Sequence, residues 1–169
     1  MQRRAWLKLG MASAAVLAVG GGALALIEPG LRKGRLSAPG RAVMAAVARG
    51  FLDGSLPTGG GELASAMDGQ LARVDALVGA LPRHAQGELS QLLALLAGAP
   101  GRRSLAGLAP AWSEATVAEL QAALQSMRLS RLSLRRQAYH ALHDITLGAY
   151  FAAPSTWGLL GYPGPGAVG

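Results

Sequence analysis

The 169-residue sequence has no cysteine, few aromatic residues and few acids. The lack of cysteine excludes a disulfide scaffold, a Cys-ligated zinc site, an iron–sulfur cluster, a c-type haem attachment and thiol catalysis. With two Phe, three Tyr and three Trp, a hydrophobic core has to be built mostly from Leu, Ala and Val. Nine acids stand against 16 Lys and Arg, which gives a net charge of +7. The hydrophobic share of 51% excludes a disordered, charged tail protein.

The first 27 residues have the layout of an export signal, with a basic start, an apolar middle and small residues before a break. Arg3 and Arg4 are followed by one spacer and then by Trp6, Leu7 and Lys8. This order resembles the twin-arginine translocation motif Arg-Arg-x-Phe-Leu-Lys, with Trp in the place of Phe. Without the three cations of this segment, 13 cations remain against 9 acids, so much of the positive charge belongs to the signal.

The apolar run over residues 9–27 contains four glycines, which lower its hydrophobicity as in twin-arginine signals. Ala23 and Ala25 form a small–x–small pattern that predicts cleavage after Ala25. The alternative is an uncleaved anchor, because the run is close to the roughly 20 residues that a bilayer-spanning helix needs. In either case the segment predicts membrane contact and a periplasmic location.

The remaining chain divides into a basic linker (28–40), a helical domain (41–153) and an irregular tail (154–169). In the helical domain, apolar residues recur every three to four positions, and no window alternates over the length of a strand. The pattern predicts an all-α fold, a small bundle of about four or five helices preceded by the signal helix. Residues 58–61 and 101–110 are expected to be loops.

Two kinds of local signal bound the expected helices. Pro82 and Pro154 follow apolar periodic segments and should stop them. Thr116 and Glu119 have the spacing of a capping box, with Ser113 as an alternative cap one turn earlier.

The C-terminal tail contains Trp157, Tyr162, Pro163 and Pro165 together with five glycines. Its prolines exclude a regular helix and a central strand. Large aromatic side chains on such a segment have two uses that the residues alone do not separate. They can dock a partner, or they can fold back and cap the helices' own core.

His140 and His143 lie one helical turn apart, with Asp144 beside them. Two histidines at this spacing can share a metal or b-type haem, but a usable metal site needs further ligands. The sequence contains neither a nucleophile elbow nor a phosphate-binding loop, and its acids are scattered singly. Independent catalysis is therefore not expected, and no metal or cofactor of its own is assigned.

Four arginines gather where one predicted helix gives way to the next: Arg128, Arg131, Arg135 and Arg136. The stripe can be a solvated face, or it can pair with the acids of neighbouring helices or of a partner. Nucleic acid is not expected as a partner, because no aromatic residues are interleaved for base stacking.

The C-terminal third resembles the small (gamma) subunit of periplasmic FAD-dependent dehydrogenases, the gluconate 2-dehydrogenase subunit 3-like proteins with twin-arginine signals. These accompany a large subunit of the glucose–methanol–choline (GMC) oxidoreductase family. The resemblance covers the signal and residues 112–165. It is carried by Ser130-Arg131, Arg135-Arg136-x-Ala138-Tyr139, Leu142, Ala149-Tyr150-Phe151-x-x-Pro154-x-x-Trp157 and Gly161-Tyr162-Pro163-Gly164-Pro165.

The resemblance implies a non-catalytic accessory subunit without flavin or haem. It would bind the large, FAD-carrying subunit in the cytoplasm and take it, folded, through the twin-arginine translocase. The partner-binding residues would be Tyr150, Phe151, Trp157, Tyr162, Pro163 and Pro165, together with Arg131 and Arg135. Whether a cytochrome subunit joins the complex stays open. The alternative is a freestanding or membrane-tethered periplasmic helical protein with a binding or structural role.

Overall fold

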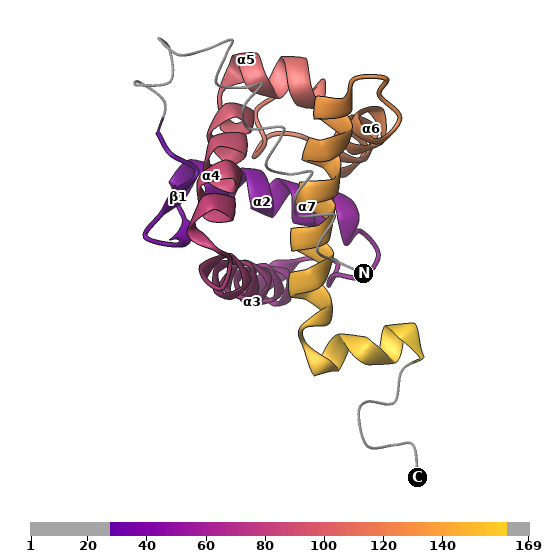
Figure 1. Cartoon of the computed structure of the whole chain (residues 1–169). Helices are drawn as coiled ribbons and strands as arrows, with labels where there is room; N and C mark the ends of the chain where they lie inside the picture. The colour runs from indigo at the N-terminus through magenta and orange to yellow at the C-terminus, as the bar shows by residue number, and fades with distance from the viewer. Residues whose placement is uncertain (1–27, 162–169) are drawn as a thin grey trace.

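Helix α2 (Ala38–Phe51) lies at the centre of the molecule in the computed structural model, which describes residues 28–161 (Figure 1). It packs against α3 (Gly60–Gly79), α4 (Arg83–Ala97), α6 (Val117–Arg128) and α7 (Ser133–Phe151). The predicted signal residues Arg3, Arg4, Trp6, Leu7, Lys8, Ala23 and Ala25 fall outside the described residues, as do Tyr162, Pro163 and Pro165.

The described chain is mostly helical, as predicted, but its elements differ from the expected four or five helices. Residues 28–161 contain six α-helices and one two-stranded sheet. One of the six is the short helix α5 (Ala99–Gly101), which leads directly into a π-helical turn, η2 (Arg102–Ala106). A loop was expected over residues 101–110. The first part of the tail forms a 3-10 helix, η3 (Pro154–Leu160), rather than irregular chain.

Helix starts follow the local signals that the sequence carries. The Ser37 hydroxyl accepts a hydrogen bond from the Gly40 amide at the start of α2. At the start of α6, the Thr116 hydroxyl accepts from the Glu119 amide while the Glu119 carboxylate accepts from the Thr116 amide. These reciprocal bonds satisfy amides that have no partner within the helix. The capping box is thereby confirmed, with Thr116 rather than Ser113 as the cap.

The segment predicted as a linker contains a β-hairpin instead. Strand β1 (Leu31–Arg32) pairs antiparallel with β2 (Arg35–Leu36), and both turn residues between them, Lys33 and Gly34, have positive φ. Side chains distant in sequence hold this hairpin. Ser90 Oγ of α4 accepts from the Leu31 amide at 3.0 Å, and Asp75 Oδ1 of α3 accepts from the Leu36 amide at 2.7 Å.

Two glycines allow the hairpin to approach the helices closely. Gly30 donates its amide to the Ser90 carbonyl, and a Cβ at this position would overlap the Leu93 side chain. A Cβ at Gly40 would overlap the Gly30 carbonyl oxygen. Because both contacts involve backbone or a buried side chain, larger residues cannot be accommodated without moving the helices.

The core is built mainly from Leu, Val and Ala contributed by all the long helices. A second, smaller cluster of Ala48, Leu52 and Tyr150 joins the end of α2 to the end of α7. Trp112 is buried in the larger cluster, where its indole N–H donates to the Leu96 carbonyl at 2.7 Å. None of the helices between residues 28 and 161 combines the length and hydrophobicity that a bilayer-spanning segment requires.

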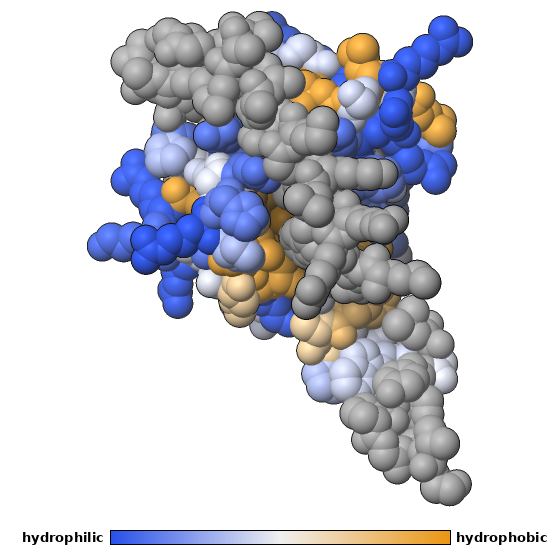
Figure 2. All heavy atoms as spheres, viewed as in Figure 1, coloured by the Kyte–Doolittle hydropathy of each residue, from blue (hydrophilic) through white to orange (hydrophobic). Residues whose placement is uncertain are grey.

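The surface carries one local concentration of exposed apolar side chains. Leu129 and Leu132, in the turn between α6 and α7, expose 68% and 65% of their surface. They are the two large hydrophobic residues that the described part of the chain leaves exposed. In Figure 2, orange residues and long blue side chains lie together at the upper right, over this end of α6 and α7.

Candidate functional site

Three predicted partner-binding aromatic residues lie close together at the C-terminal end of α7. The Tyr150 and Phe151 rings meet edge to face, with their centroids 5.2 Å apart. The indole N–H of Trp157, on η3, donates to the Phe151 carbonyl at 2.8 Å. Tyr150 is buried, whereas Phe151 and Trp157 are half-buried.

Helix η3 is fastened to the end of α7 by side-chain hydrogen bonds to the carbonyls of Tyr150, Phe151 and Ala153. Thr156 Oγ1 donates to the Tyr150 carbonyl at 3.1 Å and to the Ala153 carbonyl at 2.8 Å. The Trp157 indole N–H donates to the carbonyl of Phe151. Trp157 therefore folds back on α7, yet among residues 28–161 it belongs to neither buried cluster.

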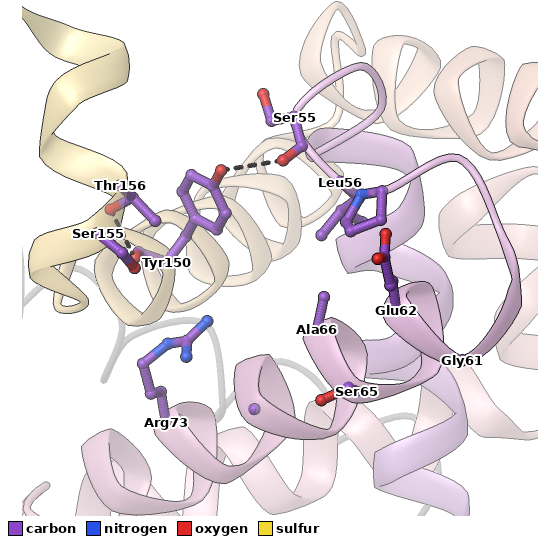
Figure 3. A pocket seen from close by; sticks show the side chains of 12 residues that line it. Ser55, Leu56, Gly61, Glu62, Ser65, Ala66, Arg73, Tyr150, Ser155 and Thr156 are labelled. Carbon is purple, nitrogen blue, oxygen red and sulfur yellow. Dashed lines mark hydrogen bonds between the residues drawn. The ribbon is translucent and has the colours of Figure 1, made fainter.

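A groove of about 690 Å³ opens beside these aromatic residues (Figure 3). It lies between the α2–α3 loop, the first half of α3 and the junction of α7 with η3. The Tyr150 hydroxyl donates to the Ser55 carbonyl at 3.2 Å and so joins the loop to α7. The groove is lined by Ser55, Leu56, Pro57, Gly61, Glu62, Ser65, Ala66, Gly69, Arg73, Tyr150, Ser155 and Thr156.

Arg73 and Gln70 of α3 hold the end of α7 beside the groove. Arg73 Nε donates to the Ala149 carbonyl at 2.9 Å, and its Nη2 donates to Gln70 Oε1 at 3.0 Å. Gln70 is fully buried and donates to the Thr146 carbonyl at 2.9 Å. A guanidinium at the C-terminal end of a helix also faces the negative end of the helix dipole. Neither residue was expected from the sequence, because no local motif marks it. Their hydrogen-bond partners in α7, Thr146 and Ala149, lie 76 positions away.

The predicted arginines do not belong to this site. Arg131 lies in the turn before α7 and Arg135 in the first turn of that helix, whereas Tyr150 and Phe151 lie at its end. A 19-residue helix separates the two ends by about 28 Å at 1.5 Å per residue. Arg135 is moreover committed to the fold, because it donates to the Leu105 carbonyl at 2.7 Å and to Ser126 Oγ at 2.9 Å.

The two neighbouring histidines of α7 take part in ring contacts. The rings of His143 and Tyr139 stack with centroids 5.7 Å apart, and His143 meets Phe51 edge to face at 5.3 Å. His143 Nδ1 also lies 3.0 Å from Asp144 Oδ1. Within residues 28–161, no three His, Asp or Glu side chains are grouped so that they could hold a metal ion. The groove's serines have no histidine among the other lining residues to act as a base.

No family model, curated protein or solved structure matches the chain.

Proposed function

We propose that this protein is a non-catalytic accessory subunit that binds a large FAD-dependent dehydrogenase subunit and accompanies it, folded, through the twin-arginine export route to the periplasm. Three features support the proposal. The first residues resemble a twin-arginine signal. The C-terminal third resembles the small subunits of GMC-type dehydrogenases. The end of α7 presents aromatic surface beside a groove.

The observation that carries the proposal is the arrangement of Phe151 and Trp157. Both rings are half-buried, and the bond from the Trp157 indole to the Phe151 carbonyl holds η3 against α7. Aromatic side chains that are fixed before binding lose little conformational entropy when a partner covers them. Tryptophan is also among the residues that contribute most to binding at protein interfaces.

The adjoining groove extends this aromatic surface. Its polar groups come from serines, Thr156, Glu62 and Arg73, while Leu56, Pro57 and Ala66 provide apolar walls. Mixed apolar and polar linings suit a projecting segment of another protein, which needs both burial and hydrogen bonds. Tyr162, Pro163 and Pro165 follow η3 directly in the sequence and are proposed to continue the docking surface.

Under this proposal the chemistry belongs to the partner. The large subunit carries FAD and oxidises the substrate, and the present chain contributes neither a cofactor nor a catalytic residue. Its signal serves both subunits, which explains why a chain without a cofactor motif would use a route for folded proteins.

The proposal is tested by affinity purification of the C-terminally tagged protein from its native periplasm. We expect a yellow eluate with flavin absorbance and a large flavoprotein in stoichiometric amount. A colourless protein that elutes alone under gentle conditions would overturn the proposal and favour the freestanding helical module.

Export provides an independent test. Replacing both signal arginines by lysine, Arg3→Lys with Arg4→Lys, should leave this protein and the flavoprotein together in the cytoplasm. The matched control, Arg32→Lys with Arg35→Lys, makes the same two exchanges in the hairpin and should not affect export. Normal export of the flavoprotein in the signal variant would contradict the escort role.

A further inference from the structure

The turn between α6 and α7 combines exposed leucines with arginines. Leu129 and Leu132 project from it at 68% and 65% exposure, and Arg128 and Arg131 beside them are exposed as well. We call this turn, residues 128–132, the basic tip. Burying such leucines against another surface is favourable, because it removes their apolar area from water.

The charges around the basic tip are held in position but not neutralised. Arg136 Nη1 donates to the carbonyls of Ser130 and Arg131 at 2.7 and 3.0 Å. Arg128 Nε donates to the Gln125 amide oxygen at 3.1 Å. In the described part of the chain, the ion pairs of arginine with acids are Arg32–Glu28 and Arg41–Asp75, both away from the tip. The cations of the tip are therefore available to an anionic surface.

We propose that the basic tip binds the surface of a bilayer that contains anionic phospholipids. Leucines at the boundary between headgroups and acyl chains remove apolar area from water, while arginines beside them attract lipid phosphates. Lipids can close around a projecting turn, whereas a protein partner would have to supply a matching pocket and matching acids. This membrane contact is separate from the proposed docking site, which lies at the other end of α7.

The tip is far from the proposed docking site in the described part of the chain. The α6–α7 turn precedes α7, and η3 follows the other end of that helix (Figure 1). The hairpin that follows the predicted signal segment lies beside the middle of α4, where Gly30 and Leu31 bond to Ser90.

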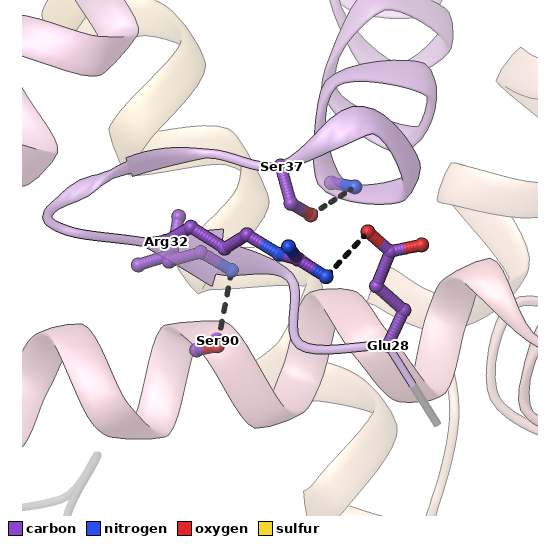
Figure 4. Close-up of polar contacts among 6 residues, drawn as sticks. Glu28, Arg32, Ser37 and Ser90 are labelled. Carbon is purple, nitrogen blue, oxygen red and sulfur yellow. Dashed lines mark hydrogen bonds and ion pairs between the residues drawn. The ribbon is translucent and has the colours of Figure 1, made fainter. Parts of the chain in front are cut away.

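The first described residues are themselves tied down. Figure 4 shows Arg32 paired with Glu28 at 3.1 Å and the Leu31 amide bonded to Ser90. Residues 9–27, which precede them, are predicted to contact the membrane during export or as an anchor. Contact of that segment with a membrane would keep the whole domain, the tip included, close to a lipid surface.

The test measures binding of the full chain to vesicles by co-sedimentation. Vesicles of phosphatidylglycerol and phosphatidylcholine are compared with vesicles of phosphatidylcholine alone, at about 0.1 M salt so that long-range charge effects are screened. The variant Arg128→Gln with Arg131→Gln should lower binding to the anionic vesicles about 25-fold, since each arginine near such a surface contributes about fivefold. Leu129→Ser with Leu132→Ser should lower it by at least about tenfold.

The matched control is Arg35→Gln with Arg83→Gln, which removes the same net charge from exposed arginines elsewhere on the domain. All variants retain residues 1–27, so any binding by that segment is common to them. The proposal predicts less than about a twofold change for the control. Equal losses in the tip and control variants would overturn it, because only net charge would then matter. Unchanged vesicle binding in the tip variant, with loss of a co-purifying acidic protein, would overturn it in favour of a protein partner.

Discussion

Gln70 provides the sharpest test of how the groove is held together. Its amide is fully buried between α3 and α7, donates to the Thr146 carbonyl and accepts from Arg73. Replacing it by Met keeps most of the volume but removes both hydrogen bonds. Replacing it by Ala removes the bonds and leaves a cavity as well. The two variants therefore separate the polar contribution from the packing contribution.

The magnitudes follow from these contacts. The bond between the two uncharged groups is worth about 1 kcal/mol, and the bond from the Arg73 guanidinium about 1.5 kcal/mol or more. Gln70→Met should accordingly lower the free energy of unfolding by about 2.5 kcal/mol. Truncating a buried side chain of this size to Ala typically costs 2–5 kcal/mol in all, so we expect about 3–4 kcal/mol for Gln70→Ala.

Urea unfolding followed by circular dichroism measures both losses, and an unchanged m-value shows that the folded and unfolded states are comparable. The control is Gln125→Ala, at an exposed glutamine whose bond to Arg128 should contribute less than about 0.5 kcal/mol. If Gln70→Met matched the original protein to within about 0.5 kcal/mol, the buried amide would not stabilise the α3–α7 contact. The hydrogen bond from Arg73 to Gln70 would then not stabilise the contact either.

Three further predictions concern other parts of the molecule. The Thr116 amide and hydroxyl hold the pKa of Glu119 below its ordinary value of 4.5. The ionised carboxylate therefore stabilises the fold above that pH, and this contribution is lost as the pH falls through the lowered pKa. Unfolding curves between pH 7 and 3 should show the loss, and the variant Glu119→Gln should not show it. Gly101→Ala should destabilise the fold by about 1–3 kcal/mol in the urea assay, because the new Cβ would overlap the Leu95 carbonyl oxygen. The control Gly87→Ala, whose Cβ would have no atom within 4 Å, should be neutral or stabilising. Trp157→Ala should weaken the complex with the flavoprotein by about 2 kcal/mol and leave the helical circular dichroism intact; a large loss of helix signal would place Trp157 in the core instead.

The long helices were predictable because their signals are local. The capping box at Thr116 and the stops at Pro82 and Pro154 act through neighbouring backbone groups, so a few consecutive residues suffice to recognise them. The 3-10 form of η3 was not expected, since Pro154 excludes a continued α-helix but does not choose among the alternatives.

The hairpin and the groove were not predictable in this way. The amides of Leu31 and Leu36 in the two strands donate to Ser90 and Asp75, and those partners lie 59 and 39 positions away. The groove likewise depends on the bond between Tyr150 and Ser55, which are 95 positions apart. The sequence does identify Tyr150, Phe151 and Trp157 as a set. It does not reveal that Tyr150 joins two segments while the other two residues remain partly accessible.

Gly30 packs closely against α4, so the chain is fixed to the domain at this residue. This limits the distance between the domain and any protein or membrane that binds the preceding segment. Five peptide units separate Ala25 from Gly30, and a fully extended chain of that length spans at most roughly 17 Å. A signal peptidase that cuts after Ala25 has to work almost in contact with the folded domain. If the segment stays in the membrane, the same short span keeps Gly30 within roughly 17 Å of the residue that holds the chain there, and a dehydrogenase bound as proposed would also stay close to the lipid.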